Sequence, residues 1–329
     1  MSQSTLSLIL QNGSQYLAGI MAGCITGAKV FPHTLGLPKY KSFVQLYDKG
    51  FEVKLDEHTK QLAQEVLDAM NMKEEMEARV ELFVAYGQDM VSKGSLNTRK
   101  GGIVGIPANF KYLSTDNVER NKVVLNNKGV DWNSSAGEKL AEAMVLSDNA
   151  KKFAIAREIF TIKSYFYAVD ALLASFSFLG SYSFGYFINR KMGLREKLPM
   201  VVRGGLYTGF ACLGLLTYVL VRDAYNCRQD RKLDQKAGTL MPALALGGVE
   251  YYTKLLQRNI ALRELLGNSG SSLYTAYGNV TQSWRTPKLS LTAHRDLMIR
   301  LVEEYNNSSN KMGDAKETEH REETEAVTG

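Results

Sequence analysis

The sequence predicts a mostly helical α+β membrane protein with a transmembrane helical hairpin, an N-terminal span, and a small α+β domain between them. Two long apolar runs, 165–188 and 204–221, are separated by a short basic linker, 189–203. The first 28 residues carry no charged side chain. Residues 33–164 combine helical and alternating patterns and are water-soluble in character, which is typical of a folded domain.

The hairpin prediction rests on length and composition. A helix needs about 20 apolar residues to cross a hydrocarbon core of roughly 30 Å, and both runs meet that length once Val201 and Val202 are counted with the second. A hairpin buried in a soluble domain is the alternative, since serines, glycines and tyrosines interrupt both runs. Asp170 is the one acidic residue of the first run. An acid inside a span indicates function by default, but its place near the start of the run favours a membrane-interface position.

The N-terminal segment, 1–32, is predicted to be an uncleaved membrane anchor. Gly19, Gly23 and Gly27 repeat every four residues, so they share one helix face that favours close packing against other membrane helices. A signal peptide would need a basic segment before the apolar core, and none is present. A buried helix is the third possibility. We expect Lys29 and Pro32 to end the helix.

The remaining chain divides into three parts by pattern. Within 33–164 we expect a helix over His58–Met72, an N-terminal capping box from Ser135 to Glu138, and a helix capped by Ser147. Residues 222–305 are predicted to be helical, and 306–329, which are polar and acidic, to be disordered. The other expected elements are strands over Arg79–Tyr86 and Lys122–Leu125, a strand within Gly102–Phe110 that runs into a turn at Pro107, and a helix over Gly248–Gly267.

Composition and motifs argue against several function classes. The net charge of +6 is scattered and forms no basic block with interleaved aromatics, so we expect no nucleic-acid partner. The sequence has no phosphate-binding loop, no H-E-x-x-H and no C-x-x-C, and its four histidines are scattered. Cys24 and Cys212 lie in apolar runs, where packing is favoured over binding of Cu(I). We predict no metal, no cofactor and no catalytic residue.

Several short blocks together carry a specific resemblance. Val104–Pro107, Val130–Trp132, Lys152–Glu158 and Gly247–Tyr251 resemble the signature blocks of the transmembrane protein 177 family, in the same order and around the same hairpin. The resemblance covers roughly residues 102–279. It implies a mitochondrial inner-membrane protein without known catalysis. The implied partners are cytochrome c oxidase subunit 2, which the family stabilises before its copper site is filled, and the assembly chaperone and copper-delivery factors of that subunit.

A second similarity is to HtpX-like membrane zinc peptidases. These enzymes place H-E-x-x-H before a hydrophobic hairpin and E-x-x-x-D after it. In this chain Glu158 would take the general-base position and Asp230 that of a zinc ligand, whereas Arg157 and Thr161 replace the two histidines; Asp234 completes the second motif. A catalytic zinc needs three protein ligands, so the pattern would imply a peptidase relative without its metal. Ordinary polar residues on an amphipathic helix are the favoured alternative.

The charges of the linker predict topology. Five cations against Glu196 alone place the linker in the matrix by the positive-inside rule, so the N-terminus would also lie in the matrix and the folded parts in the intermembrane space. Lys29, Lys39 and Lys41 oppose this orientation. A membrane hydrolase and a secretory-pathway protein remain as alternative functions. The sequence has glycosylation motifs for the latter at Asn12, Asn133, Asn279 and Asn307.

Overall fold

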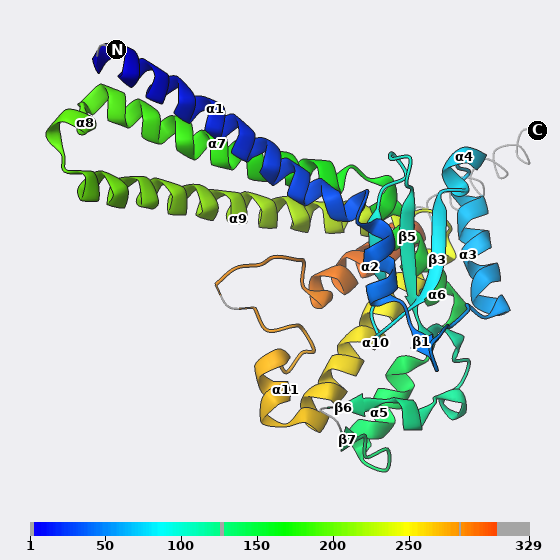
Figure 1. The fold of residues 1–329 in the computed structure, drawn as a ribbon. Helices are drawn as coiled ribbons and strands as arrows, with labels where there is room; N and C mark the ends of the chain where they lie inside the picture. Colours follow the sequence, from blue (N-terminus) through cyan, green and yellow to red (C-terminus); the bar gives the residue numbers. More distant parts are fainter. Residues whose placement is uncertain (1–2, 126–127, 283, 308–329) are drawn as a thin grey trace, which may run out of the picture.

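The computed structural model describes residues 3–125, 128–282 and 284–307, without the side chains of 3–12 and 128. A long arm of helices projects from an α+β body, and the N-terminus lies at the tip of the arm (Figure 1). Helix α1 (Gln3–Val30) runs beside α7 (Phe166–Met192), short α8 (Leu194–Lys197) turns at the tip, and α9 (Met200–Gly238) returns to the body. The N-terminus and the basic linker are therefore at the same end of the arm.

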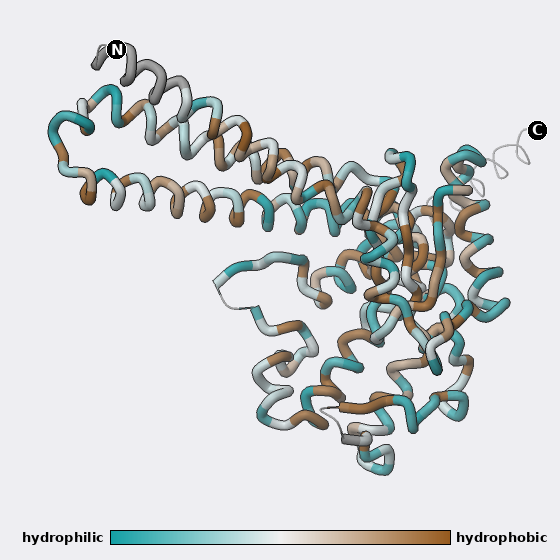
Figure 2. Tube along the Cα trace, viewed as in Figure 1, coloured by the Kyte–Doolittle hydropathy of each residue, from teal (hydrophilic) through white to brown (hydrophobic). Residues whose placement is uncertain are grey.

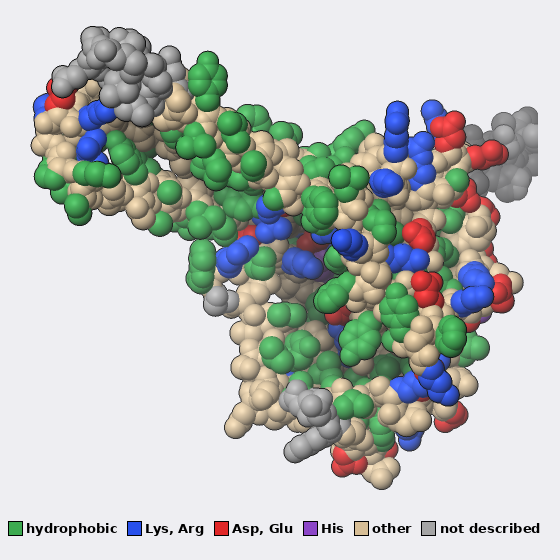
Figure 3. Space-filling model, viewed as in Figure 1, with side chains coloured by type: hydrophobic (Ala, Val, Ile, Leu, Met, Phe, Trp, Pro, Cys, Tyr) green, Lys and Arg blue, Asp and Glu red, His purple; other side chains and the backbone are tan. Residues whose placement is uncertain are grey.

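The arm contains the membrane hairpin that the sequence predicts. Helices α7 and α9 are long and apolar enough to span a bilayer, and their apolar windows are 17% and 0% buried, respectively. Figure 3 shows many apolar side chains on the visible face of the arm, and Figure 2 shows hydrophobic residues along its helices. Such surface is stable only if lipid or protein covers it. The alternative of a hairpin buried inside a soluble domain is wrong.

Helix α1 packs through alanines rather than glycines. Ala18 and Ala22 are buried, whereas a Cβ added at Gly19, Gly23 or Gly27 would meet nothing within 4 Å. Among the described residues, α7 and α9 alone pass the length and hydropathy test for a span. The polar residues 11–15 interrupt the apolar sequence of α1, so a third span stays a prediction. The glycine face likewise remains a prediction for contact with other proteins.

The body is organised around a three-stranded sheet of order β3-β5-β4. The central strand β5 (Gly102–Pro107) is buried at every position and pairs in parallel with β3 (Val80–Ala85) and antiparallel with β4 (Val91–Gly94). Helices α3 (Glu57–Ala69), α6 (Asp148–Lys163) and α10 (Ala243–Leu266), the end of α9 and helix 291–307 close the same core. Segments 33–164 and 222–305 are therefore one folded unit.

Most of the expected elements form close to the expected residues. Ser147 caps α6 by accepting a hydrogen bond from the Ala150 N–H, and α10 ends before Gly267. The remaining elements are α2 (Leu37–Val44), α4 (Glu74–Glu77), α5 (Ser135–Met144), α11 (Asn268–Leu273), β1 (Tyr47–Asp48), β2 (Phe51–Glu52), β6 (Val124–Leu125) and β7 (Lys128–Gly129).

Two local expectations were wrong. The cap of α5 is Ser134 and not Ser135, because the extended backbone of Ser134 lets its hydroxyl accept from the Gly137 N–H. The strand expected from Lys122 begins only at Val124, because residues 120–122 form a 3₁₀ turn. Residues 306 and 307 continue helix 291–307, and the rest of the predicted acidic tail lies outside the described residues.

Candidate functional site

Four of the five residues in the peptidase-like pattern meet in one ion cluster. The Arg157 guanidinium, from α6, lies 2.9 Å through Nε from Asp234 Oδ1 and 2.9 Å through Nη2 from Asp230 Oδ1, both on α9. Its Nη1 lies 2.8 Å from Oε1 of Glu158. Each guanidinium nitrogen thus donates to a different carboxylate, an arrangement that the planar fork of arginine supports.

The cluster continues into α10 and helix 291–307 through residues that the sequence did not single out. The Tyr252 hydroxyl donates to Asp234 Oδ1 at 2.7 Å, and His294 Nδ1 is paired with Asp234 Oδ2. The Tyr252 and His294 rings stack with centroids 4.7 Å apart. No catalytic motif includes either residue: Tyr252 directly follows the Gly247–Tyr251 block, His294 is one of the four scattered histidines, and both lie far from Arg157 in sequence. We call Arg157, Glu158, Asp230, Asp234, Tyr252 and His294 the Arg157 cluster.

The charges of the Arg157 cluster interact strongly because the cluster is largely shielded from water. Asp234 is fully buried. Burial alone would raise the pKa of Asp234, but the hydrogen bond from His294 and the charge of Arg157 outweigh it and hold the pKa below its usual value. Burial raises the pKa of Tyr252 well above its usual value, so its hydroxyl remains a hydrogen-bond donor. Asp234 is therefore an ionised acceptor held by three donors.

The donor set does not fit a catalytic zinc. The guanidinium of Arg157 lies among the carboxylates and would repel a divalent cation. The Thr161 hydroxyl donates 3.0 Å to the carbonyl of Arg157, one helical turn back, and is thus used within its own helix. Among the described residues, no three His, Cys, Asp or Glu side chains are arranged to hold a metal ion. The carboxylates are therefore arranged around the guanidinium of Arg157, which serves as a buried structural cation, and they leave no open coordination position for a metal ion.

A second ion cluster joins the three arm helices where they meet the body. Asp170 on α7 accepts from Lys29 Nζ of α1 at 3.1 Å and from the Tyr218 hydroxyl of α9 at 3.0 Å. Arg222 Nε of α9 lies 2.7 Å from Asp170 Oδ1. The Asp170 side chain is 12% exposed. The Asp170 carboxylate is therefore largely buried within an ion cluster and is not simply exposed to water at the membrane interface. We call Lys29, Asp170, Tyr218 and Arg222 the Asp170 cluster.

Removing the central cation tests the role of the Arg157 cluster. Arg157→Leu should lower the free energy of unfolding by about 3–5 kcal/mol, because it leaves buried carboxylates without a partner. Thermal unfolding in mild detergent measures the effect. The control is Arg231→Leu, an exposed position on α9 next to Asp230, which should change stability by less than about 0.5 kcal/mol. Equal melting temperatures for the two variants would contradict the assignment.

The lowered pKa of Asp234 predicts a specific pH dependence. A carboxyl with a depressed folded-state pKa stabilises the fold above its unfolded-state pKa, near 3.9, and loses that contribution as pH falls through the folded-state value. Asp234→Asn should therefore melt well below the wild type at pH 7, with a gap that narrows below about pH 4. Asp296→Asn, at an exposed carboxyl, should show no such gap. A gap independent of pH would refute the electrostatic explanation.

Comparison of the sequence with known proteins assigns this chain to a family. The transmembrane protein 177 family profile matches residues 40–291. Transmembrane protein 177 of Homo sapiens is 32% identical over 299 residues, covering 90% of this chain and 94% of the human protein. The protein of the same name from Danio rerio is 29% identical, covering 92% and 97%. No solved structure matches this chain. With its two membrane-spanning helices, the chain belongs to the transmembrane protein 177 family.

Proposed function

We propose that this protein is a non-enzymatic assembly factor of the mitochondrial inner membrane that stabilises newly made cytochrome c oxidase subunit 2 within its assembly chaperone complex. Linker 189–203 lies in the matrix, and the body lies in the intermembrane space. The partners are the subunit and its assembly chaperone and copper-delivery factors. The proposal takes this role from the family resemblance, to which the geometry adds a compatible architecture.

The geometry is suited to a protein whose arm lies in the membrane and holds the folded body at the membrane surface. Helix α9 runs without interruption from the apolar arm into the core of the body, where Leu233 and Ala237 are buried. At about 1.5 Å per residue its 39 residues span roughly 58 Å, well beyond the bilayer core. The body is therefore fixed relative to the arm, as contact with both parts of a membrane-inserted client would require.

One observation argues most directly for a role without catalysis. Arg157 holds Glu158, the residue that would serve as general base in a peptidase of this pattern, in an ion pair. A general base must reach the proton that it removes, and each oxygen of this carboxylate already faces a donor of the protein itself, Arg157 at one and Ser92 at the other. Side chains of the protein itself, rather than a substrate, therefore lie against the Glu158 carboxylate.

A metal-free peptidase relative is a second candidate, and a specific observation favours it. The HtpX-like pattern required residues before and after the hairpin to converge, and Arg157, Asp230 and Asp234 do so. A scaffold of that ancestry could bind polypeptide without cleaving it. This reading is compatible with the assembly role, whereas an active membrane hydrolase is not.

The assembly role is tested by capture of a labelled client. Mitochondrial translation products are pulse-labelled in cells carrying a tagged copy, and the tagged protein is captured in mild detergent. We expect selective recovery of oxidase subunit 2. Gly23→Ile should reduce recovery severalfold if the exposed glycine face contacts the client, whereas Gly180→Ile on α7, which is equally open, should not.

The same experiment separates the two remaining function classes. Glu158→Gln should leave the recovery of subunit 2 unchanged; loss of a zinc-dependent cleavage in this variant would establish a hydrolase instead. A tagged protein that is mitochondrial but recovers no labelled subunit would refute the assembly role. A glycosidase-sensitive mass shift would indicate the secretory pathway. The shift is expected at Asn133, which is exposed, rather than at Asn279, whose carboxamide is hydrogen-bonded to the hydroxyl and the backbone N–H of Thr292.

A further inference from the structure

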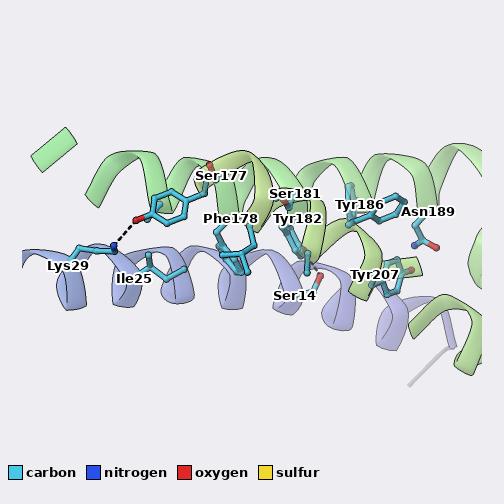
Figure 4. A pocket seen from close by; sticks show the side chains of 17 residues that line it. Ser14, Ile25, Lys29, Ser177, Phe178, Ser181, Tyr182, Tyr186, Asn189 and Tyr207 are labelled. Carbon is cyan, nitrogen blue, oxygen red and sulfur yellow. Dashed lines mark hydrogen bonds between the residues drawn. The ribbon is translucent and has the colours of Figure 1, made fainter. Parts of the chain in front are cut away.

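A cavity of about 660 Å³ lies inside the arm, between α1, α7 and α9. Most of its wall area is apolar, from residues such as Ile25, Phe178, Phe210 and Leu215, and serine, tyrosine and asparagine side chains also line it. Figure 4 shows side chains of these helices turned into it along its length, from Lys29 at one end to Asn189 and Tyr207 at the other. The cavity thus extends along the arm, within the part of the molecule that the membrane surrounds.

The size and lining of the cavity limit what can occupy it. A helix about 10–12 Å wide that crosses a 30 Å hydrocarbon core occupies roughly 2,400–3,400 Å³, so a partner helix does not fit. The apolar part of the wall, which is most of its area, offers a water molecule few hydrogen-bond partners. The volume is within the range of small-molecule sites. A narrow apolar occupant, such as the acyl chain of a lipid, satisfies both constraints.

The end of the cavity nearest the body carries an excess of positive charge. Lys29 and Tyr218 line the cavity and also belong to the Asp170 cluster, where two cations, Lys29 and Arg222, face the single carboxylate of Asp170. Figure 3 shows Lys and Arg side chains gathered where the arm meets the body. The side chains of Lys29 and Arg222 are 34% and 33% exposed, respectively, so an anion can reach them.

Lys93 of β4, whose Nζ lies 5.5 Å from the centroid of the Tyr40 ring, is a third cation that interacts electrostatically with Asp170, Arg222 and Lys29. Burial lowers the pKa of Lys93; Asp170 opposes that effect, whereas the charges of Arg222 and Lys29 add to it. Burial, aided by the charge of Lys93, also lowers the pKa of nearby His33 to about 4, so this ring is neutral at pH 7. Three cations against one carboxylate leave a local surplus of about two charges. Bound anions relieve such repulsion.

We propose that the arm binds one anionic phospholipid, with an acyl chain in the cavity and its phosphate group at Lys29, Lys93 and Arg222. The two parts of the site lie where a bilayer places the two parts of a lipid: the apolar cavity at the depth of the hydrocarbon and the cations at the membrane surface. Basic pockets between transmembrane helices bind acidic head groups in this way.

Lipid binding by the purified full chain tests the proposal. Native mass spectrometry in mild detergent follows titration with phosphatidylglycerol or phosphatidylcholine that carry the same acyl chains. We expect about one tightly bound lipid and at least a fivefold preference for phosphatidylglycerol, the ratio that one cation near the membrane surface provides. Inorganic phosphate should not displace the bound lipid, because it has no acyl chain.

Two pairs of variants distinguish the contribution of the cavity to lipid binding from the contribution of the positive charge. Ser177→Phe fills the cavity and should lower binding of both lipids at least tenfold, whereas Ser183→Phe, exposed on the same helix, should not. Lys93→Gln should reduce the preference for phosphatidylglycerol about fivefold, whereas Lys191→Gln at the arm tip should preserve it.

Three results would overturn the proposal: equal affinity for the two lipids, full lipid binding by Ser177→Phe, or displacement of the lipid by inorganic phosphate. An unchanged preference in Lys93→Gln would refute the position assigned to the phosphate. Melting temperatures of the four variants confirm that each is folded, so loss of binding is not confused with unfolding.

Discussion

The ion pairs that Arg157 forms with Asp230 and Asp234 determine how the membrane arm is joined to the body. These aspartates lie on the second half of α9, whose first half is the second membrane span, so α6 of the body holds the spanning helix directly. A buried carboxylate without a partner is costly. Burial of this part of α9 in the core therefore depends on the guanidinium, and with it the position of the body at the membrane.

The blocks that carry the family resemblance mostly serve this architecture. A Cβ on Gly247 would lie 2.3 Å from the Asn149 carbonyl, so only glycine lets α10 approach the start of α6. Further along α10, beyond these blocks, Asn259 Nδ2 donates to the Gly278 carbonyl at 2.8 Å and holds the segment after α11 against α10. These residues explain a fold rather than an activity. The surfaces available for partners lie elsewhere, on the apolar arm and the exposed glycine face of α1.

Local patterns predicted the elements well, whereas long-range contacts could not be read from the sequence. Hydropathy and caps located the hairpin, α6 and the buried strand β5, because their signals lie within a few consecutive residues. The shared core of 33–164 and 222–305 escaped prediction, since no local pattern reports which helices meet. Likewise, the peptidase-like pattern singled out Arg157 and Asp234, each in its own motif, whereas Tyr252 and His294 belong to no such motif. The sequence explained Asp170 by a position at the membrane interface, because it could not show that Lys29 and Arg222 lie beside this carboxylate in the fold.

The most direct test of this account is a double-mutant cycle between α6 and α9. Unfolding free energies are measured in mild detergent for the wild type, Arg157→Leu, Asp230→Ala and the double variant. If the ion pair joins the arm to the body, the two substitutions should be coupled by at least about 1 kcal/mol, with the double variant less destabilised than the sum of the single ones. Additivity to within about 0.3 kcal/mol would mean that the two side chains act independently and would contradict the account.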